Sequence, residues 1–386
     1  MINKNNILLP EGLKDLLIEE ASDEFELVKS LLESFQSSGY EIVKPPLIEH
    51  EDSILNNVGK KLEENMFKLI DPKTQKTLCL RPDITIQISR IASSRLLNVS
   101  RPLRLSYSGD ILRLRTTQIR PERQFNQTGF ELIGEESHLA DIEVISLAVE
   151  SLKKIGVLNI SIDLTLPTFI QTVCNDLDLS SEETAVIRGL LDKKDLASLR
   201  KLKFTKETNI FESVLNSIGP VTKALGILDS LKLSDKAKNL ISHIDDVYKG
   251  LKKDLPDIII TLDLSELNGF EYHTGLGFSL FSPQAKSELG KGGRYLTSNS
   301  ESAVGFSVYL DSLLKISIEN KKGNRILIPL AVSFEESKKL RDAGWLTVKL
   351  YKESTNLYND AVNLRCSYIF YGNEPRPLDQ IREILR

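Results

Sequence analysis

The sequence predicts an α+β protein with a helical insertion and a small C-terminal α/β unit. Residues 80–134 contain segments in which apolar and polar residues alternate, which is typical of half-buried strands. Residues 13–36 and 138–154 instead repeat apolar residues every three or four positions, which is typical of amphipathic helices. A mostly helical pattern over about 167–253 separates this first part from further strands.

Composition bounds the size of the core and the strength of the electrostatic field. The chain has 386 residues, 41% hydrophobic and 27% charged, so it can bury a full core and is expected to hold two or more domains. The net charge of −4 creates no global field that attracts nucleic acid. Any nucleic-acid contact would have to be local.

The three cysteines, Cys79, Cys174 and Cys366, are widely separated and show no CxxC spacing. They indicate buried thiols in a reducing compartment, and neither a disulfide framework nor a zinc site. The first residues make no convincing signal peptide, and no window approaches eighteen uninterrupted apolar residues. We expect a cytoplasmic protein that is not bound to a membrane.

The N-terminal elements are a helix and a strand. The helix over 13–36 ends before Gly39, which is a common residue after a helix. The alternating segment 40–44 runs into Pro45-Pro46, which predicts an edge strand or the entry to an interface. The apolar stripe of the helix comprises Phe25, Val28, Leu31, Leu32 and Phe35.

Residues 63–80 predict a hairpin around Pro72-Lys73, and a helix is expected over 84–97. Two strands are expected at 103–107 and 111–115, with a turn at Gly109-Asp110 between them. Another strand-like run covers 124–134.

The segment from Arg81 to Arg123 contains nine arginines and no lysine. Arginine suits two-pronged binding of carboxylate or phosphate better than lysine does. In the following strand, Gln127, Gly129 and Glu131 share one face, which would suit a small polar ligand lying on a sheet. For any single residue, the alternative is a solvated sheet face with surface salt bridges.

The later elements follow the same patterns. Strands are expected at 158–166 and 256–264, and the glycine- and aromatic-rich segment 266–281 is equally compatible with a ligand site or a bulged strand. Residues 290–295 (GKGGRY) lack the spacing of a phosphate loop and favour a tight turn, and 303–314 reads as a strand running into a helix. Three short strands between helical segments are expected after residue 321.

The order LRPD (80–83), LRLR (112–115) and ERQFNQTGFELIG (122–134) resembles the class II aminoacyl-tRNA synthetase core, specifically its histidyl branch. ELNGFEYHTG (266–275), GGRY (292–295) and the segment 303–314 resemble, in order, three further signatures of that branch. The resemblance implies an antiparallel sheet core over 1–320 with a helical insertion at about 167–253, a small C-terminal domain over 321–386, and a dimer.

Two departures bear on catalysis. Activating an amino acid with ATP requires cations on the developing phosphate charge. Where the synthetase pattern places two such arginines, this sequence has Asn268 and Ser312, although Arg113 remains. Adenylation is therefore not expected, and no catalytic residue is assigned.

The amino-acid pocket is better preserved. The resemblance places the amino group of a bound histidine against Asp83, Thr85 and Gln127, and gives Glu131 the role of the family's pocket glutamate. A histidine, His273, replaces a tyrosine of the family, and Asn268 removes a carboxylate-binding arginine. A degenerate polar pocket is the alternative. The full expected histidine-binding set is Asp83, Thr85, Arg113, Gln127, Glu131, Tyr272 and His273.

A synthetase core with these losses is similar to the regulatory subunits of ATP phosphoribosyltransferase. That resemblance implies a chain without catalytic activity of its own, which joins a short catalytic subunit in the first step of histidine biosynthesis and mediates feedback by histidine. It implies a homodimer within a hetero-oligomer, with no cofactor, metal or tRNA. The alternatives are an active histidyl-tRNA synthetase and a stand-alone amino-acid sensor.

Overall fold

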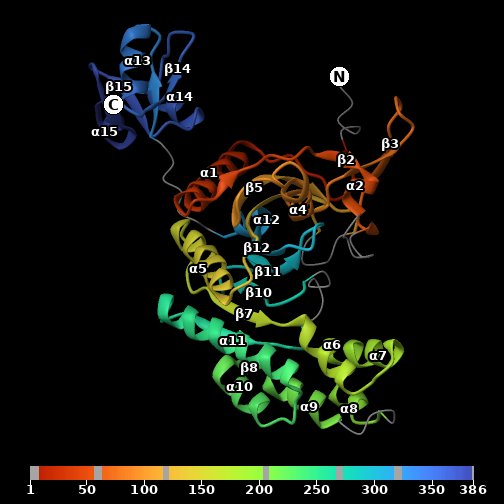
Figure 1. Cartoon of the computed structure of the whole chain (residues 1–386). Coiled ribbons are helices and arrows are strands. Elements are labelled where there is room, and N and C mark those ends of the chain that lie inside the picture. The colour runs from red at the N-terminus through yellow and green to blue at the C-terminus, as the bar shows by residue number, and fades with distance from the viewer. Residues whose placement is uncertain are drawn as a thin grey trace. The chain divides into compact units, whose positions relative to one another are not determined.

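The computed structural model describes residues 8–55, 63–115, 121–202, 208–266, 273–316 and 324–384. The chain divides into two compact units, Met1–Ile318 and Glu319–Arg386. The larger unit is built on a nine-stranded sheet of order β1-β5-β6-β12-β11-β10-β7-β9-β8 (Figure 1). Its strands are β1 (Glu41–Ile42), β5 (Leu103–Leu112), β6 (Gln124–Ile133), β7 (Ser161–Thr165), β8 (Gly219–Pro220), β9 (Ile259–Leu262), β10 (Gly277–Phe281), β11 (Gly290–Leu296) and β12 (Ser302–Tyr309).

Neighbouring strands of this sheet are antiparallel, except for the parallel pairs β1–β5 and β7–β9. The prediction of an α+β fold with an antiparallel-dominated sheet is therefore confirmed. The short helix α12 (Leu310–Leu313) follows β12 directly, as expected for a strand that runs into a helix.

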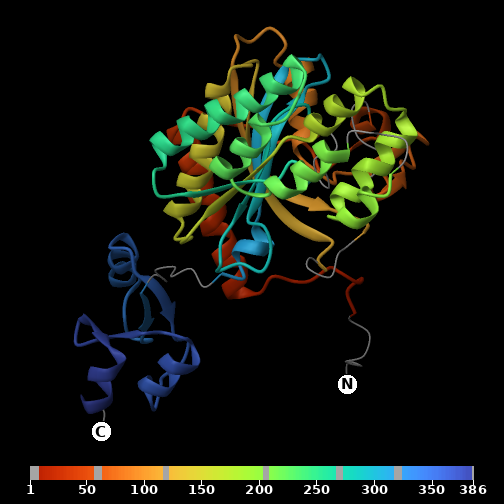
Figure 2. The same ribbon diagram turned by 90° about the horizontal axis from the view of Figure 1, so that it is seen from below.

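Helices α1 (Ile18–Ser37) and α5 (His138–Lys154) cover the sheet face that carries Phe130 and Leu132. Alongside α5 lies α11 (Asp235–Asp254), and Figure 2 shows the two on one side of the sheet strands. The bounds predicted for α5 agree with the structure. Helix α1 begins five residues later than predicted, and Phe25, expected on its buried stripe, is 67% exposed.

The helical insertion gathers at the β7–β8–β9 end of the sheet (Figure 1). A serine followed three residues later by a glutamate, as at Ser180 and Glu183, is a sequence signal that predicts a helix start. Helix α7 (Ser181–Asp192) confirms it, because it begins with a capping box in which these two side chains accept from each other's backbone N–H groups. The other helices of the insertion before α11 are α6 (Pro167–Asp176), α8 (Leu196–Leu199), α9 (Thr208–Ser217) and α10 (Val221–Asp229).

A separate three-stranded sheet, order β2-β4-β3, lies next to helices α2 (Glu51–Leu55) and α4 (Thr85–Ser94). The hairpin predicted over 63–80 is the antiparallel pair β3 (Lys68–Ile70) and β4 (Thr77–Leu80). Strand β2 (Ile48–His50) pairs with β4 on its other side.

Two expectations that rested on glycines are wrong. Gly109 does not make a turn: β5 continues through it, and the missing Cβ leaves room for the guanidinium of Arg81, which donates to the Asp110 carbonyl at 2.7 Å. The segment 290–295 is not a tight turn but part of strand β11. A Cβ on Gly292 would overlap the Phe278 ring and the Gly305 carbonyl, so this glycine permits close packing of neighbouring strands.

The smaller unit has a four-stranded sheet of order β14-β13-β15-β16. The three strands predicted here are β13 (Arg325–Ile328), β14 (Leu346–Lys349) and β15 (Tyr368–Tyr371). The fourth, β16 (Glu374–Pro377), was not predicted, and it contains two prolines. It lies at the sheet edge, where proline is tolerated. The helices are α13 (Phe334–Asp342), α14 (Leu357–Asn363) and α15 (Leu378–Ile384).

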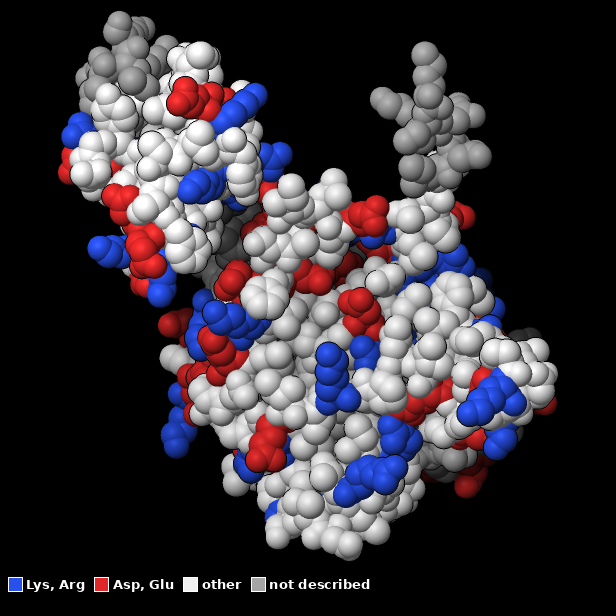
Figure 3. Space-filling view, turned by 90° about the horizontal axis from the view of Figure 1, so that it is seen from above, with Lys and Arg blue, Asp and Glu red and all other residues white. Residues whose placement is uncertain are grey.

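The cysteines and the surface charges agree with the expectations from composition. All three cysteines are buried free thiols. On the face shown in Figure 3, acidic and basic side chains of the described residues are interspersed. None of the helices in the described part of the chain is long and apolar enough to cross a bilayer.

Candidate functional site

Alternation along paired strands brings a glutamate and a tyrosine to the same sheet face. Leu105 of β5 lies opposite Glu131 of β6, and Tyr107 lies opposite Gly129. A Cβ on Gly129 would lie 2.7 Å from the Tyr107 hydroxyl, so the glycine leaves room for that ring to reach Glu131.

Glu131 is 1% exposed, and both of its carboxyl oxygens accept hydrogen bonds from tyrosines. Tyr107 donates to Oε1 and Tyr295 of β11 donates to Oε2, each at 3.0 Å. Burial raises the pKa of Glu131 to about 8, although hydrogen bonds from Thr85, Tyr295 and Tyr107 oppose that rise. At neutral pH this carboxyl group is therefore largely protonated.

Tyr107 is the centre of a buried hydroxyl network. Its oxygen lies 3.0 Å from Thr85 Oγ1 and 2.7 Å from Ser307 Oγ of β12, besides its bond to Glu131. Burial raises the pKa of Tyr107 well above its ordinary value, so the phenol stays protonated. The network fixes the orientation of Glu131.

A second polar group of the site surrounds Gln127. Its amide nitrogen donates to Ser307 Oγ at 2.9 Å and to Asp83 Oδ2 at 3.3 Å, while its oxygen accepts from the Ile84 backbone at 2.8 Å. Asp83 Oδ1 accepts from the Thr85 backbone N–H at 2.8 Å. Asp83, Thr85, Gln127 and Glu131, predicted as one set, are thus linked through a continuous set of hydrogen bonds.

Arg113 lies at the edge of this group. Its Nη2 is 3.6 Å from Asp83 Oδ2 and 3.2 Å from the Tyr309 hydroxyl, and its Nε donates to the Pro82 carbonyl at 3.2 Å. The guanidinium also lies over the rings of Phe125 and Tyr309, at 5.4 and 5.1 Å from their centroids.

His273 lines one small cavity together with the network. The cavity has a volume of about 10 Å³. Its lining comprises Thr85, Glu131, His273, Lys291, Gly292, Gly293, Tyr295, Gly305, Phe306 and Ser307. The predicted site residue Tyr272 and the departure at Asn268 both lie outside the described residues.

Three residues of the network, Tyr107, Tyr295 and Ser307, were not predicted. Tyr107 could have been found, because it is an odd-numbered residue of a strand whose odd positions face Glu131. Ser307 belongs to β12, which pairs with β6, and Tyr295 belongs to β11, which pairs with β12. The sequence does not reveal this strand order.

The second predicted departure, Ser312, is described. It lies in α12, is buried, and its Oγ is 3.1 Å from Ser287 Oγ. A small neutral hydroxyl therefore occupies the position at which the synthetase pattern has an arginine.

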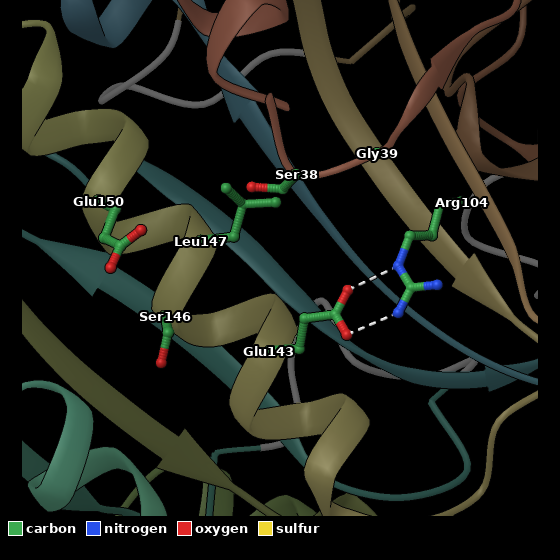
Figure 4. Close-up of a pocket in the computed structure, with 7 residues that line it drawn as sticks. All are labelled: Ser38, Gly39, Arg104, Glu143, Ser146, Leu147 and Glu150. Atoms are coloured by element: carbon green, nitrogen blue, oxygen red, sulfur yellow. Dashed lines mark hydrogen bonds and ion pairs between the residues drawn. The ribbon is translucent and has the colours of Figure 1, made fainter. Parts of the chain in front are cut away.

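A second pocket, of about 490 Å³, opens on the other face of β5 (Figure 4). Arg104 donates through Nε and Nη2 to the two carboxylate oxygens of Glu143, both at 2.9 Å. The buried Tyr40 also donates to Glu143, at 3.0 Å. The Glu143 carboxylate therefore already has a two-pronged partner, which leaves it less to offer a ligand, while the second acid of the lining, Glu150, is exposed. The lining is Ser38, Gly39, Arg104, Glu143, Ser146, Leu147 and Glu150.

Within the described residues, no group of three or more His, Cys, Asp and Glu side chains is arranged to hold a metal ion.

Comparisons with known proteins identify relatives over nearly the whole chain. Residues 12–313 match the family model of histidyl-tRNA synthetase. An ATP phosphoribosyltransferase regulatory subunit from Rhodospirillum centenum is 39% identical over 372 residues, which cover 96% of each chain. One from Rhodospirillum rubrum is 35% identical and covers 96% of this chain and 97% of its own.

Solved structures share the fold. A structure described as an ATP phosphoribosyltransferase regulatory subunit/histidyl-tRNA synthetase from Bacillus halodurans superposes with a TM-score of 0.81 at 24% identity, covering 94% of this chain and 98% of its own. A histidyl-tRNA synthetase from Nostoc sp. PCC 7120 gives 0.78 at 18% identity, covering 95% and 91%. The fold of class II aminoacyl-tRNA synthetases, predicted from the motifs, is confirmed.

Proposed function

This chain belongs to the family of ATP phosphoribosyltransferase regulatory subunits, and we propose that it is a non-catalytic subunit that controls a separate, short catalytic chain in histidine biosynthesis. The observation that carries this proposal is that the acidic residues of the pocket are retained while an arginine of the synthetase pattern is replaced. The acidic pocket around Glu131 and Asp83 is assembled, whereas Ser312 supplies no cation for a developing phosphate charge. This combination suits a chain that binds an amino acid without activating it.

The effector we propose is histidine, bound by Asp83, Thr85, Arg113, Gln127, Glu131 and His273, with Tyr272 from the segment outside the described residues. A carboxyl group suits an imidazole N–H, and the Asp83 carboxylate suits an ammonium. Because Glu131 is buried between hydroxyls, a ligand cation or N–H donor next to it would favour its ionised form. Charge complementarity is therefore the physical basis for choosing an amino acid with a basic side chain.

Regulation then follows from linkage. If histidine binds one state of the complex better than another, it shifts the complex toward that state by the difference in affinity. The alternative of an active synthetase has less support, because Ser312 is neutral, buried and bonded to another serine. A stand-alone sensor would bind histidine but affect no phosphoribosyltransferase.

We also propose a homodimer within the hetero-oligomer. Near β1 and β2, Ile42, Leu47 and Ile48 are each more than 40% exposed, and apolar side chains in such a group favour an interface.

We further propose that residues 1–320, with the insertion at about 167–253, form one domain and 321–386 another. The three buried free thiols support a cytoplasmic location.

The test is the phosphoribosylation of ATP by a short catalytic subunit, measured alone, with this chain, and with this chain plus L-histidine. The proposal predicts that the chain raises the rate and that histidine reverses the gain. An unchanged rate on adding the chain would contradict it. Histidine-dependent exchange of pyrophosphate into ATP by the chain alone would instead support the synthetase alternative.

A further inference from the structure

The cavity at Glu131 has a basic side chain in its lining that the proposed histidine-binding set does not include. Among the described residues that line this cavity, Lys291 of β11 is the only lysine or arginine. Its side chain is 29% exposed, so Lys291 lies at the edge of the cavity, where solvent also reaches it. The cavity therefore combines a buried carboxyl group, that of Glu131, with a cation at its edge.

Strand alternation places Lys291 on the same sheet face as the hydroxyl network. Lys291 and Tyr295 are four positions apart in β11 and so point to one face, and Tyr295 donates to Glu131. On the neighbouring strand β12, Lys291 lies directly opposite Ser307, which belongs to the same network. The ammonium group is thus delivered to the face on which the ligand is proposed to bind.

Beside Glu131, the next two strands carry glycines. Gly305 of β12 lies opposite Glu131, and Gly293 of β11 lies opposite Gly305. A Cβ at Gly305 would overlap the carboxyl group of Glu131, so that group rests directly on the glycine. Two strand spacings and a two-residue step along a strand put the backbones of Lys291 and Glu131 about 12 Å apart. This separation allows the two polar groups to act on opposite ends of one small ligand.

The alternative role of Lys291 is a purely structural ion pair. Its Nζ lies 3.8 Å from Glu288 Oε1, and both side chains are 29% exposed. A partly exposed pair at this distance contributes little to stability. The ammonium group can therefore exchange the carboxylate of Glu288 for that of a ligand.

The charge of Lys291 also acts on Glu266, the first residue of the segment 266–275. Burial raises the pKa of Glu266, and the positive charges of Lys194 and Lys291 oppose that rise. The synthetase pattern has its carboxylate-binding arginine two positions later, where this sequence has Asn268. Lys291 thus supplies a positive charge near the start of the segment that lacks this arginine.

We propose that Lys291 binds the carboxylate of the amino-acid ligand and so takes over the role of the arginine that Asn268 replaces. The inference rests on the proposed function in requiring an amino acid, but it applies to any α-amino acid. A lysine ammonium is a point charge on a flexible stem, so it can reach a carboxylate from the edge of the cavity. The pocket would then select amino acids over amines of similar shape.

The experiment compares the full-length chain with Lys291→Met, with the conservative Lys291→Arg, and with Lys286→Met. Lys286 is an exposed lysine between β10 and β11 that does not line the cavity, so it is a matched control. Calorimetric titrations use L-histidine and L-histidinol, which has a hydroxymethyl group in place of the carboxylate. We expect Lys291→Met to bind L-histidine about tenfold more weakly, the low end for a contact between charged groups because Lys291 is partly exposed.

The other titrations separate a ligand contact from a structural role. Lys291→Arg and Lys286→Met should bind L-histidine nearly as the unmodified chain does. Lys291→Met should bind L-histidinol no more weakly than the unmodified chain, because this ligand has no carboxylate to lose. If Lys291→Met fails to fold, Lys291→Gln retains a polar group, and the same directions are expected for it.

Unchanged L-histidine binding by Lys291→Met would overturn the proposal and leave histidine as the effector. Equal losses of L-histidine and L-histidinol would also overturn it, because they would show that Lys291 only maintains the pocket. If the chain binds another amino acid and not L-histidine, a selective loss of that amino acid in Lys291→Met would support the role of Lys291 and contradict histidine as the effector.

Discussion

The strand pair β5–β6 places an acid near each of its two faces, in contrasting surroundings. On one face, Glu131 is 1% exposed and is held by the hydroxyls of Tyr107 and Tyr295. On the other face, Arg104 forms a two-pronged ion pair with Glu143 of α5, and both side chains are about one-third exposed (Figure 4). The first acid is bonded to neutral groups and the second to a cation.

In our proposal, this difference separates a ligand site from a structural contact. A buried acid between neutral donors has a raised pKa and gains from an incoming cation or N–H donor. An acid that already has a two-pronged arginine at the surface gains little from another partner. Volume alone would instead favour the pocket at Glu143, which is the larger of the two.

The largest contrast should appear in the pH dependence of stability. The pKa of Glu131 is about 8 in the folded chain and about 4.3 in a model peptide. Between these values the folded state holds a proton that the unfolded state has lost, so stability falls as pH rises, by about 1.4 kcal/mol per unit. The Glu131→Gln variant has no carboxyl group to titrate at this position. Its free energy of unfolding should therefore rise relative to that of the unmodified chain by about 4 kcal/mol from pH 5 to pH 8.

Urea unfolding at half-unit steps of pH measures this gain. Parallel stability profiles for the two proteins would show that the folded chain does not hold the extra proton.

A smaller contrast should separate two buried tyrosines that both donate to a glutamate. Tyr107→Phe removes a hydroxyl that has three buried partners and should cost about 2–3 kcal/mol. Tyr40→Phe removes one hydrogen bond to Glu143, whose carboxylate still has Arg104 as a partner. It should lower the free energy of unfolding by about 1 kcal/mol or less. Thermal and urea unfolding compare them, and equal losses would mean that the hydroxyl network has no special stability.

The smallest effect is expected for the ion pair in the second pocket. Since both side chains are partly exposed, the coupling between Arg104 and Glu143 should be about 1 kcal/mol or less and should shrink in 1 M salt. A double-mutant cycle with Arg104→Met and Glu143→Gln measures it. A coupling free energy above about 2 kcal/mol that is insensitive to salt would contradict this expectation, because it is the behaviour of a buried salt bridge.

The sequence predicted most elements of the larger unit because periodicity and caps are local signals. Helix α5 and the capping box of α7 are examples. It failed at Gly109 and Gly292, because a glycine that makes a turn and one that admits a neighbouring side chain look alike until the neighbour is known.

The candidate site shows the same limit. Gln127 and Glu131 could be placed on one face from alternation within one strand. Tyr295 and Ser307 could not, because they reach Glu131 only through the pairing of β12 with β6, which lies more than 160 positions earlier in the chain. The small volume of the cavity at Glu131 also has no signal in the sequence, because it depends on how side chains from several strands pack.

The most direct test of the account is the concentration of L-histidine that half-inhibits ATP phosphoribosylation in the complex with a short catalytic subunit. It should be measured with Glu131→Ala and with Glu143→Ala, each relative to its own rate without histidine. The account predicts that this concentration rises about 10- to 100-fold for Glu131→Ala, as for a lost hydrogen bond to a charged group. It predicts little change for Glu143→Ala. Equal sensitivity of the two variants, with Glu131→Ala folded, would contradict the claim that the buried acid receives the effector.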